Sequence, residues 1–109
     1  MYQLYKSALF MRQWEHYALY YKEEAGVKIA GNFVDLVENA INFISEKPEA
    51  CAIYKTNGEL AEYQYRKWRV KKFPYTVFFR IEEKKIYIDA IYAHKMDMDG
   101  RFLEDLHGG

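Results

Sequence analysis

The chain has 109 residues with a formal net charge of zero, and half of its residues are apolar and 18% aromatic. This composition excludes a disordered chain, and the length predicts one domain, 1–109, whose core needs no disulfide. No apolar run approaches the roughly 18 residues of a membrane span, the N-terminus lacks a secretory signal, and the single cysteine fits a reducing compartment, so we expect a cytoplasmic protein without membrane association.

The first half of the chain predicts a short strand followed by two helices. Residues 2–6 alternate weakly, and Ser7 then offers an oxygen for a helix N-cap. Apolar residues spaced by three and four predict helices over 8–25 and 27–46. Gly26 is placed to end the first helix in a left-handed cap, and Pro48 prevents the second from continuing. The short gap between the helices predicts an antiparallel pair.

The second half predicts three strands, over 62–72, 74–82 and 85–93. The Asn-Gly pair at 57–58 is a turn signal, and the charged residues 82–85 supply a short hairpin loop. The predicted fold is α+β with the order β-α-α-β-β-β, in which the helical hairpin packs on one face of an antiparallel sheet and leaves the other face largely open. Two sets of residues should each share one sheet face: Tyr75, Val77, Phe79 and Ile81, and Ile86, Ile88, Ala90 and Tyr92.

The segment 66–80, RKWRVKKFPYTVFFR, concentrates positive charge, with six Lys or Arg residues and no acidic one. Strand alternation would send Lys67, Arg69 and Lys71 to one face and Arg66 and Trp68 to the other. Three cations on one sheet face repel each other unless an anion lies across them, which predicts a phosphate backbone or an acidic peptide as ligand. The alternative is a solvated edge that lysines protect from aggregation.

Other candidates give weaker signals. Phe78 should point away from the core, on the side of Arg80, where it is either exposed or covered by a partner. His94 ends the last predicted strand beside Lys95, and either exchanges protons or bonds to the backbone. The three histidines show no ligand spacing, and the sequence contains no phosphate-binding glycine loop or serine nucleophile motif. We therefore expect no metal and no cofactor, and we assign no catalytic residue.

The run RKWRVKKFPYTVFFRIEEKKIYIDAIYAHK resembles the C-terminal half of the RelE/ParE toxins of bacterial type II toxin–antitoxin systems, which include plasmid stabilisation proteins. The most specific part is Arg66, then Phe73-Pro74-Tyr75, then the strand pair ending at His94. The resemblance implies a toxin of about this length that a cognate antitoxin neutralises. RelE-like members cut mRNA in the ribosome, whereas ParE-like members inhibit DNA gyrase.

The residues favour the ParE branch. Lys67 and Arg69 match the phosphate-gripping positions of the ribonuclease branch, but Thr76 and Met96 stand where that branch has arginines, and Phe102 where it has a tyrosine. These residues cannot stabilise the charge that develops during RNA cleavage, although Arg101 could take over one vacant role. An mRNA endoribonuclease and a non-toxic interaction module of the same fold remain alternatives.

The predicted partners are an antitoxin, in a hetero-oligomer, and either DNA gyrase or the ribosome with mRNA. The antitoxin would cover the apolar residues Trp68 and Phe78. The residues predicted to bind the target or RNA phosphates are Arg66, Lys67, Arg69, Lys71, Arg80, His94 and Lys95. The sequence assigns no role to the tail 96–109.

Overall fold

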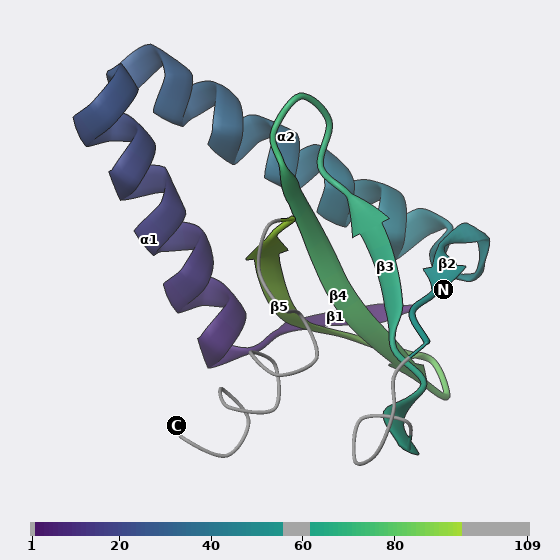
Figure 1. The fold of residues 1–109 in the computed structure, drawn as a ribbon. Coiled ribbons are helices and arrows are strands. Elements are labelled where there is room, and N and C mark those ends of the chain that lie inside the picture. Colours follow the sequence, from purple (N-terminus) through teal and green to yellow (C-terminus); the bar gives the residue numbers. More distant parts are fainter. Residues whose placement is uncertain (1, 56–61, 95–109) are drawn as a thin grey trace.

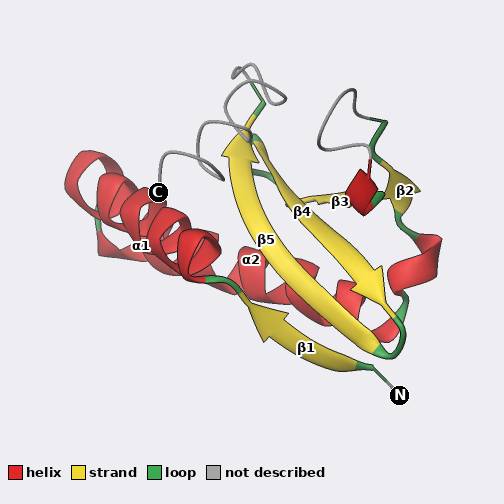
Figure 2. Cartoon of the chain, turned by 90° about the horizontal axis from the view of Figure 1, so that it is seen from below, coloured by secondary structure: helices red, strands yellow, loops and turns green. Residues whose placement is uncertain are grey.

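The computed structural model describes residues 2–55 and 62–94 and has the predicted α+β architecture (Figure 1). Two helices lie on one side of a five-stranded sheet, which Figure 2 shows from below. The elements in chain order are β1 (Gln3–Lys6), α1 (Ala8–Ala25), α2 (Val27–Glu46), the short 3-10 helix η1 (Pro48–Ala50), β2 (Ala52–Ile53), β3 (Arg66–Arg69), β4 (Tyr75–Glu82) and β5 (Lys85–Ala93). The Asn-Gly pair at 57–58 and the tail 96–109 lie outside the described residues.

Both helices have the predicted bounds, because their ends carry clear local signals. The Ser7 hydroxyl accepts a hydrogen bond from the Phe10 backbone N–H at 3.0 Å and caps α1. Gly26 is at once the C-cap of α1 and the N-cap of α2. Its φ of 96° lies in the region that glycine favours, but its ψ of 167° is extended, so the cap differs from the predicted left-handed helical conformation.

The sheet has the strand order β1-β5-β4-β3-β2. The consecutive strands β2 to β5 pair antiparallel, and for β3, β4 and β5 this follows from their short connections. The N-terminal strand β1 instead pairs parallel with β5, from Gln3 opposite Lys85 to Lys6 opposite Ile88. The sheet is therefore mixed, and its first and last strands in the chain lie side by side at one edge.

The sheet face that packs on the helices, called the inner face, carries the main core. Phe10 of α1 and Phe33, Val37 and Ile44 of α2 are fully buried there. The first predicted set is confirmed on this face, with Tyr75, Val77 and Phe79 buried in the core and Ile81 packed against it.

A β-bulge at Asp89 overturns the second predicted set. Phe78 pairs with Ala90 and Phe79 pairs with Ile88, so Asp89 is an extra residue in β5. The extra residue reverses the alternation of side chains beyond it. Ile86 and Ile88 lie in the main core as predicted, whereas Ala90 and Tyr92 lie in a second cluster on the outer face.

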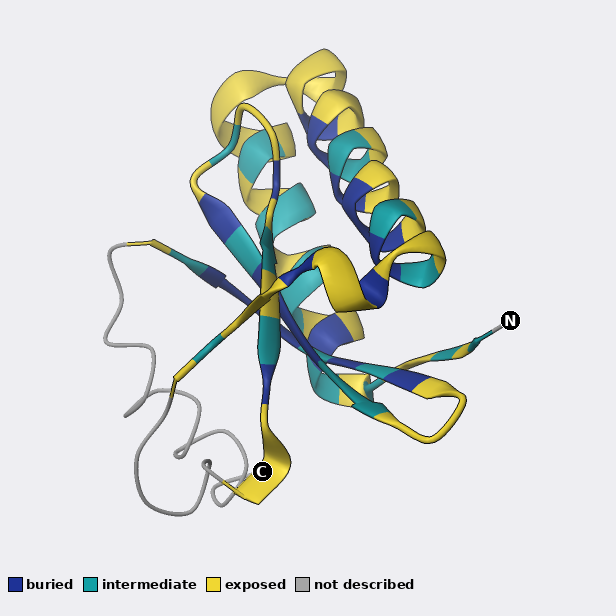
Figure 3. Cartoon of the chain, turned by 90° about the vertical axis from the view of Figure 1, so that its right-hand side faces the viewer, coloured by how far each residue is buried: buried dark blue, intermediate teal, exposed yellow. Residues whose placement is uncertain are grey.

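This second cluster also corrects the expectation of an open outer face. Tyr65, Phe78 and Tyr92 are each no more than 2% exposed, and Figure 3 shows buried segments along the sheet strands. The Tyr54 ring meets Phe78 edge-on, with ring centroids 4.9 Å apart. Aromatic contacts of this kind bury large areas, so the sheet has a core on both faces.

Candidate functional site

The side chains of β3 alternate as predicted along its four residues. Lys67 and Arg69 are exposed, whereas Arg66 and Trp68 are half-buried. Lys67 pairs across the sheet with Phe78, and Arg69 pairs with Thr76. Directly paired residues project to the same face, so both cations lie on the outer face.

The two cations line an open cleft of about 560 Å³, called here the cationic cleft. Thr76 and His94 form its rim, with the Thr76 hydroxyl 2.8 Å from Nε2 of His94. The backbone N–H of His94 also donates to the carbonyl of Pro74 at 3.0 Å, which places the ring at the end of β5. The remaining lining residues are Ala50, Ala52 and Trp68.

The positive charges of the cleft are available to a ligand. Within the described residues every ion pair involves Arg80, so neither Lys67 nor Arg69 has an acidic partner there. The Lys67 ammonium lies 5.6 Å from the centroid of the Tyr54 ring, a cation–π contact that orients it without neutralising it. An anion bound in the cleft would relieve the repulsion between these neighbouring charges.

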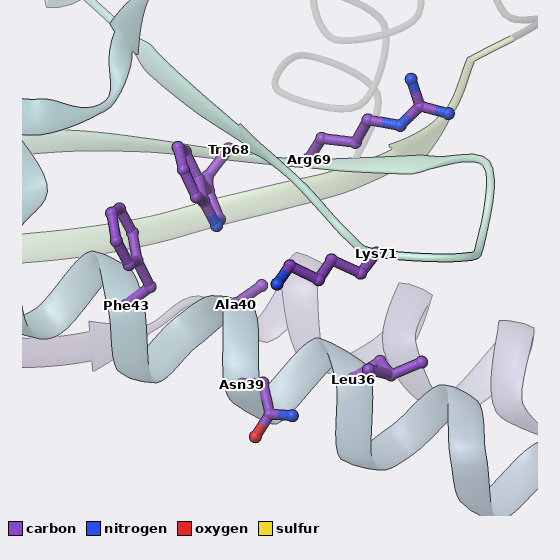
Figure 4. Close-up of a pocket in the computed structure, with 7 residues that line it drawn as sticks. All are labelled: Leu36, Asn39, Ala40, Phe43, Trp68, Arg69 and Lys71. Carbon is purple, nitrogen blue, oxygen red and sulfur yellow. The ribbon is translucent and has the colours of Figure 1, made fainter.

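Lys71 does not extend this row of charges. β3 ends at Arg69, and Lys71 and Lys72 lie in the bend before β4. In Figure 4 Lys71 points toward Asn39 and Ala40 of α2, whereas Arg69 points away from that helix. Lys72 has a φ of 67°, which regular strand geometry does not allow, so the predicted strand 62–72 was too long.

Arg66 and Arg80, also predicted to bind an anion, are occupied within the chain. Arg66 donates to the backbone carbonyls of Cys51 at 2.9 Å and Glu49 at 3.3 Å. Arg80 contacts Asp89 at 2.8 Å and Glu82 at 2.6 Å, and its guanidinium lies 4.4 Å from the Tyr87 ring centroid. These contacts neutralise Arg80, so the prediction that it belongs to the binding surface is not supported. Lys95 lies outside the described residues.

The two apolar candidates, Phe78 and Trp68, lie on opposite faces of the sheet. Phe78 is 2% exposed in the isolated chain, where it packs with Tyr54, Tyr65 and Tyr92, so it is not the exposed residue that one of the two expectations described, and its contact with an antitoxin stays a prediction. Trp68 lies on the inner side of β3 and stacks on Phe43 of α2, with centroids 4.1 Å apart and planes 9° from parallel.

Trp68 lines a groove between α2 and β3, called here the Trp68 groove (Figure 4). The groove has a volume of about 260 Å³, and its positive residues are Arg69 and Lys71. Its other lining residues are Leu36, Asn39, Ala40 and Phe43.

Sequence reasoning missed several contributors to the cleft. Ala50 reaches it from the end of η1 and Ala52 from the two-residue strand β2, which is too short to show a periodicity. Tyr54 follows that strand, and only the fold brings it to Lys67. Among the described residues, no group of three or more His, Cys, Asp or Glu side chains could hold a metal ion.

Comparison with known proteins connects this geometry to a family. The family model of the ParE toxin of the type II toxin–antitoxin system, parDE, matches residues 5–98. This chain belongs to that ParE toxin family. The match includes the end of β1, both helices and all of the cationic cleft, so the cleft is part of the ParE domain.

One solved structure, the chromosomal ParDE TA system from P. aeruginosa, has the same fold. The TM-score is 0.71 at 16% sequence identity, over 85% of this chain and 96% of that chain. No curated protein matches this chain. Within the described part of this ParE toxin, no helix is long and apolar enough to cross a membrane.

Proposed function

We propose that this ParE toxin inhibits growth by binding DNA gyrase, and that the cationic cleft is the centre of its binding surface. The supporting observation is that Lys67 and Arg69 share one exposed face without an acidic partner among the described residues. Such a site attracts an anionic surface and speeds encounter with it. Gyrase works in the cytoplasm, and we place the toxin there too.

The chemistry of the cleft favours binding over catalysis. Cleavage of RNA by its 2′-hydroxyl needs a base and also cations beside the phosphorane that forms. Thr76 lies directly opposite Arg69, where the ribonuclease branch has an arginine, and its uncharged hydroxyl is bonded to His94. The cleft therefore lacks one of the charges that cleavage would use.

The test measures supercoiling by gyrase in the presence of the purified chain. We expect the wild type to inhibit supercoiling. Each of the two charges removed in Lys67→Ala/Arg69→Ala should weaken this inhibition at least tenfold, because each charged contact contributes about 1.5–3 kcal/mol to binding. Lys84→Ala/Lys85→Ala is the matched control, since it removes the same charge at the other end of β5. Unaffected supercoiling, or equal losses in both double variants, would refute the proposal.

A second candidate, ribosome-dependent cleavage of mRNA, rests on one observation. The His94 ring lines the same cleft as Lys67 and Arg69, within reach of a bound phosphate. Translating extract with labelled mRNA tests this candidate, with His94→Gln as the decisive variant. Glutamine retains a hydrogen bond to Thr76 but cannot exchange a proton, so it should abolish cleavage and leave gyrase binding intact.

The cognate antitoxin, we propose, carries an acidic amphipathic segment that lies across β3 and forms a hetero-oligomer with the toxin. Its acidic residues would face Lys67 and Arg69, and its apolar residues would enter the Trp68 groove, whose positive residues are Arg69 and Lys71. Because the Phe78 side of the sheet is already covered, the groove is the apolar surface next to the charges.

Co-expression with the small protein encoded by the adjoining gene tests this arrangement. The wild-type toxin should be captured by the tagged neighbour, and Trp68→Ala should reduce capture at least tenfold. Leu9→Ala is the control, because Leu9 packs against the outer cluster, away from the groove. Induction of the toxin alone separates a toxin from a non-toxic module, since a non-toxic module would leave growth unchanged.

A further inference from the structure

The helical hairpin has an apolar surface that the sheet does not cover. Leu19 of α1 is 51% exposed and Val27 of α2 is 72% exposed. Both line a groove of about 450 Å³ between the two helices, near their junction at Gly26. Figure 3 shows the helix ends at that junction as exposed. Ala18 and Ala30 of its lining belong to the packed side of the helices, but the fold does not account for the exposure of Leu19 and Val27.

The α1 side of the groove carries opposite charges at its two ends. Glu15 and Lys22 line it together with Ala18 and Leu19, which lie between them in sequence. Residues seven apart lie on the same side of a helix and are about 10.5 Å apart along its axis. Because every ion pair among the described residues involves Arg80, neither Glu15 nor Lys22 is neutralised there.

We propose that this groove binds a second copy of the chain, related by a two-fold axis that crosses α1 between Ala18 and Leu19. Glu15 and Lys22 are equally distant in sequence from that point. A two-fold rotation therefore places Glu15 of each copy opposite Lys22 of the other, and forms two ion pairs around a Leu19 contact. The surface is thus complementary to itself.

The α2 side of the groove is lined by valines and small residues. Val27 and Val34 lie at its ends, with Ala30 and Gly31 between them. A Cβ built on Gly31 meets no atom within 4 Å, so the middle of the α2 stripe is open to an incoming side chain. Valines at both ends with small residues at the centre allow a second hairpin to approach closely.

The charges favour a second copy over the antitoxin as the occupant. An acidic segment would be attracted by Lys22 but repelled by Glu15, so the groove gives it no net electrostatic gain. The cationic cleft, by contrast, offers positive charges without an acidic residue in its lining. The two surfaces therefore suit different partners, and the toxin can pair with itself while an acidic ligand occupies β3.

Sedimentation equilibrium of the purified full chain, between about 1 and 100 μM, tests the proposal. We expect a monomer–dimer equilibrium in this range. Glu15→Lys and Lys22→Glu should each weaken dimerisation about tenfold, because the two-fold axis makes every reversal create two repulsive pairs. The double variant Glu15→Lys/Lys22→Glu should restore the wild-type dissociation constant. Glu38→Lys is the control, as an exposed charge of α2 outside the groove.

Gly31→Gln adds a steric test. Its side chain would project into the groove without a clash in its own chain, and glutamine favours a helix more than glycine does. The variant should therefore fold at least as stably as the wild type, by thermal unfolding, yet dimerise more weakly.

Three results would overturn the proposal. They are a wild type that stays monomeric throughout, a double variant that fails to restore association, and charge reversals that weaken antitoxin capture instead of self-association. None of these measurements uses toxicity or gyrase, so a result that refutes the dimer would not bear on the proposed inhibition of gyrase.

Discussion

Nε of Arg80 donates a hydrogen bond to Oδ2 of Asp89 at 2.8 Å, on the outer face of the sheet. The same carboxylate oxygen accepts a hydrogen bond from the Tyr65 hydroxyl at 2.9 Å. Burial, and then the charge of Asp89 and this hydrogen bond, raise the pKa of Tyr65 above its ordinary value, so Tyr65 stays a donor at neutral pH. The bulge at Asp89 thus makes one carboxylate the link between β4, β5 and the chain before β3.

Asp89→Ala should lower the free energy of unfolding by about 2–3 kcal/mol, because it leaves the Tyr65 hydroxyl and the Arg80 Nε without their acceptor. Glu82→Ala, which removes the other ion pair of Arg80, should cost at most about 0.5 kcal/mol, since surface ion pairs contribute little. The Glu82 side chain is 56% exposed and that of Asp89 only 14%. Urea unfolding followed by circular dichroism measures both, and equal losses would contradict this account.

Phe78 and Trp68 should respond differently to truncation. Phe78→Ala removes a side chain that is 2% exposed and should cost about 3–5 kcal/mol of stability, as buried aromatic truncations do. Trp68→Ala should cost less, because Trp68 is only half-buried. Its stacking on Phe43 contributes about 0.5–1.5 kcal/mol beyond the area that it buries. Thermal unfolding of both variants tests this order, and a Phe78→Ala variant as stable as the wild type would refute the second core.

Alanine should have opposite effects at two glycines. Gly26→Ala forces a φ of 96° on a residue with a Cβ, so it should cost about 1–3 kcal/mol. Gly31→Ala lies inside α2 with open space around the new Cβ, so it should stabilise the chain by about 0.5–1 kcal/mol. Melting temperatures measured side by side give the signs, and a stabilised Gly26→Ala variant would mean that the junction differs from the one described.

Cys51 should make stability depend on alkaline pH. Burial raises the pKa of its thiol to about 11, against a lowering effect of Arg66. Between the unfolded pKa near 8.5 and the folded value, only the unfolded chain releases the proton, so stability falls as pH rises through this window. Urea unfolding at pH 7 and pH 10 should show a smaller loss in Cys51→Ala than in the wild type. Equal losses would show that the thiol does not contribute.

The helices and β5 were predictable because their signals are local. Ser7 and Gly26 mark the ends of α1, and an apolar stripe of helical period runs along α2 from Phe33 to Ile44. The burial of such a stripe decides both the type of element and its length. The antiparallel order of β3, β4 and β5 followed from their short connections.

The candidate site was predicted only in part, because its geometry depends on contacts between distant segments. The exposed Lys67 and Arg69 followed from alternation. The bulge at Asp89, by contrast, has no signature in an otherwise regular apolar strand, and it determines where Tyr92 and the partners of Arg80 lie. β3 ends at Arg69, so Lys71 does not join Lys67 and Arg69 on the outer face. The strand ends there because the chain bends, with Lys72 at a positive φ, and residue propensities do not reveal such a bend.

The parallel pairing of β1 with β5 has a consequence for synthesis. Gln3 of the first strand meets Lys85 of the last, so a nascent chain must expose almost its whole length outside the ribosome before this edge can assemble. His94, at the rim of the cleft, is made later still. A product truncated before β5 therefore lacks both the complete sheet and the complete binding surface, so interrupted translation of this toxin should release inert fragments.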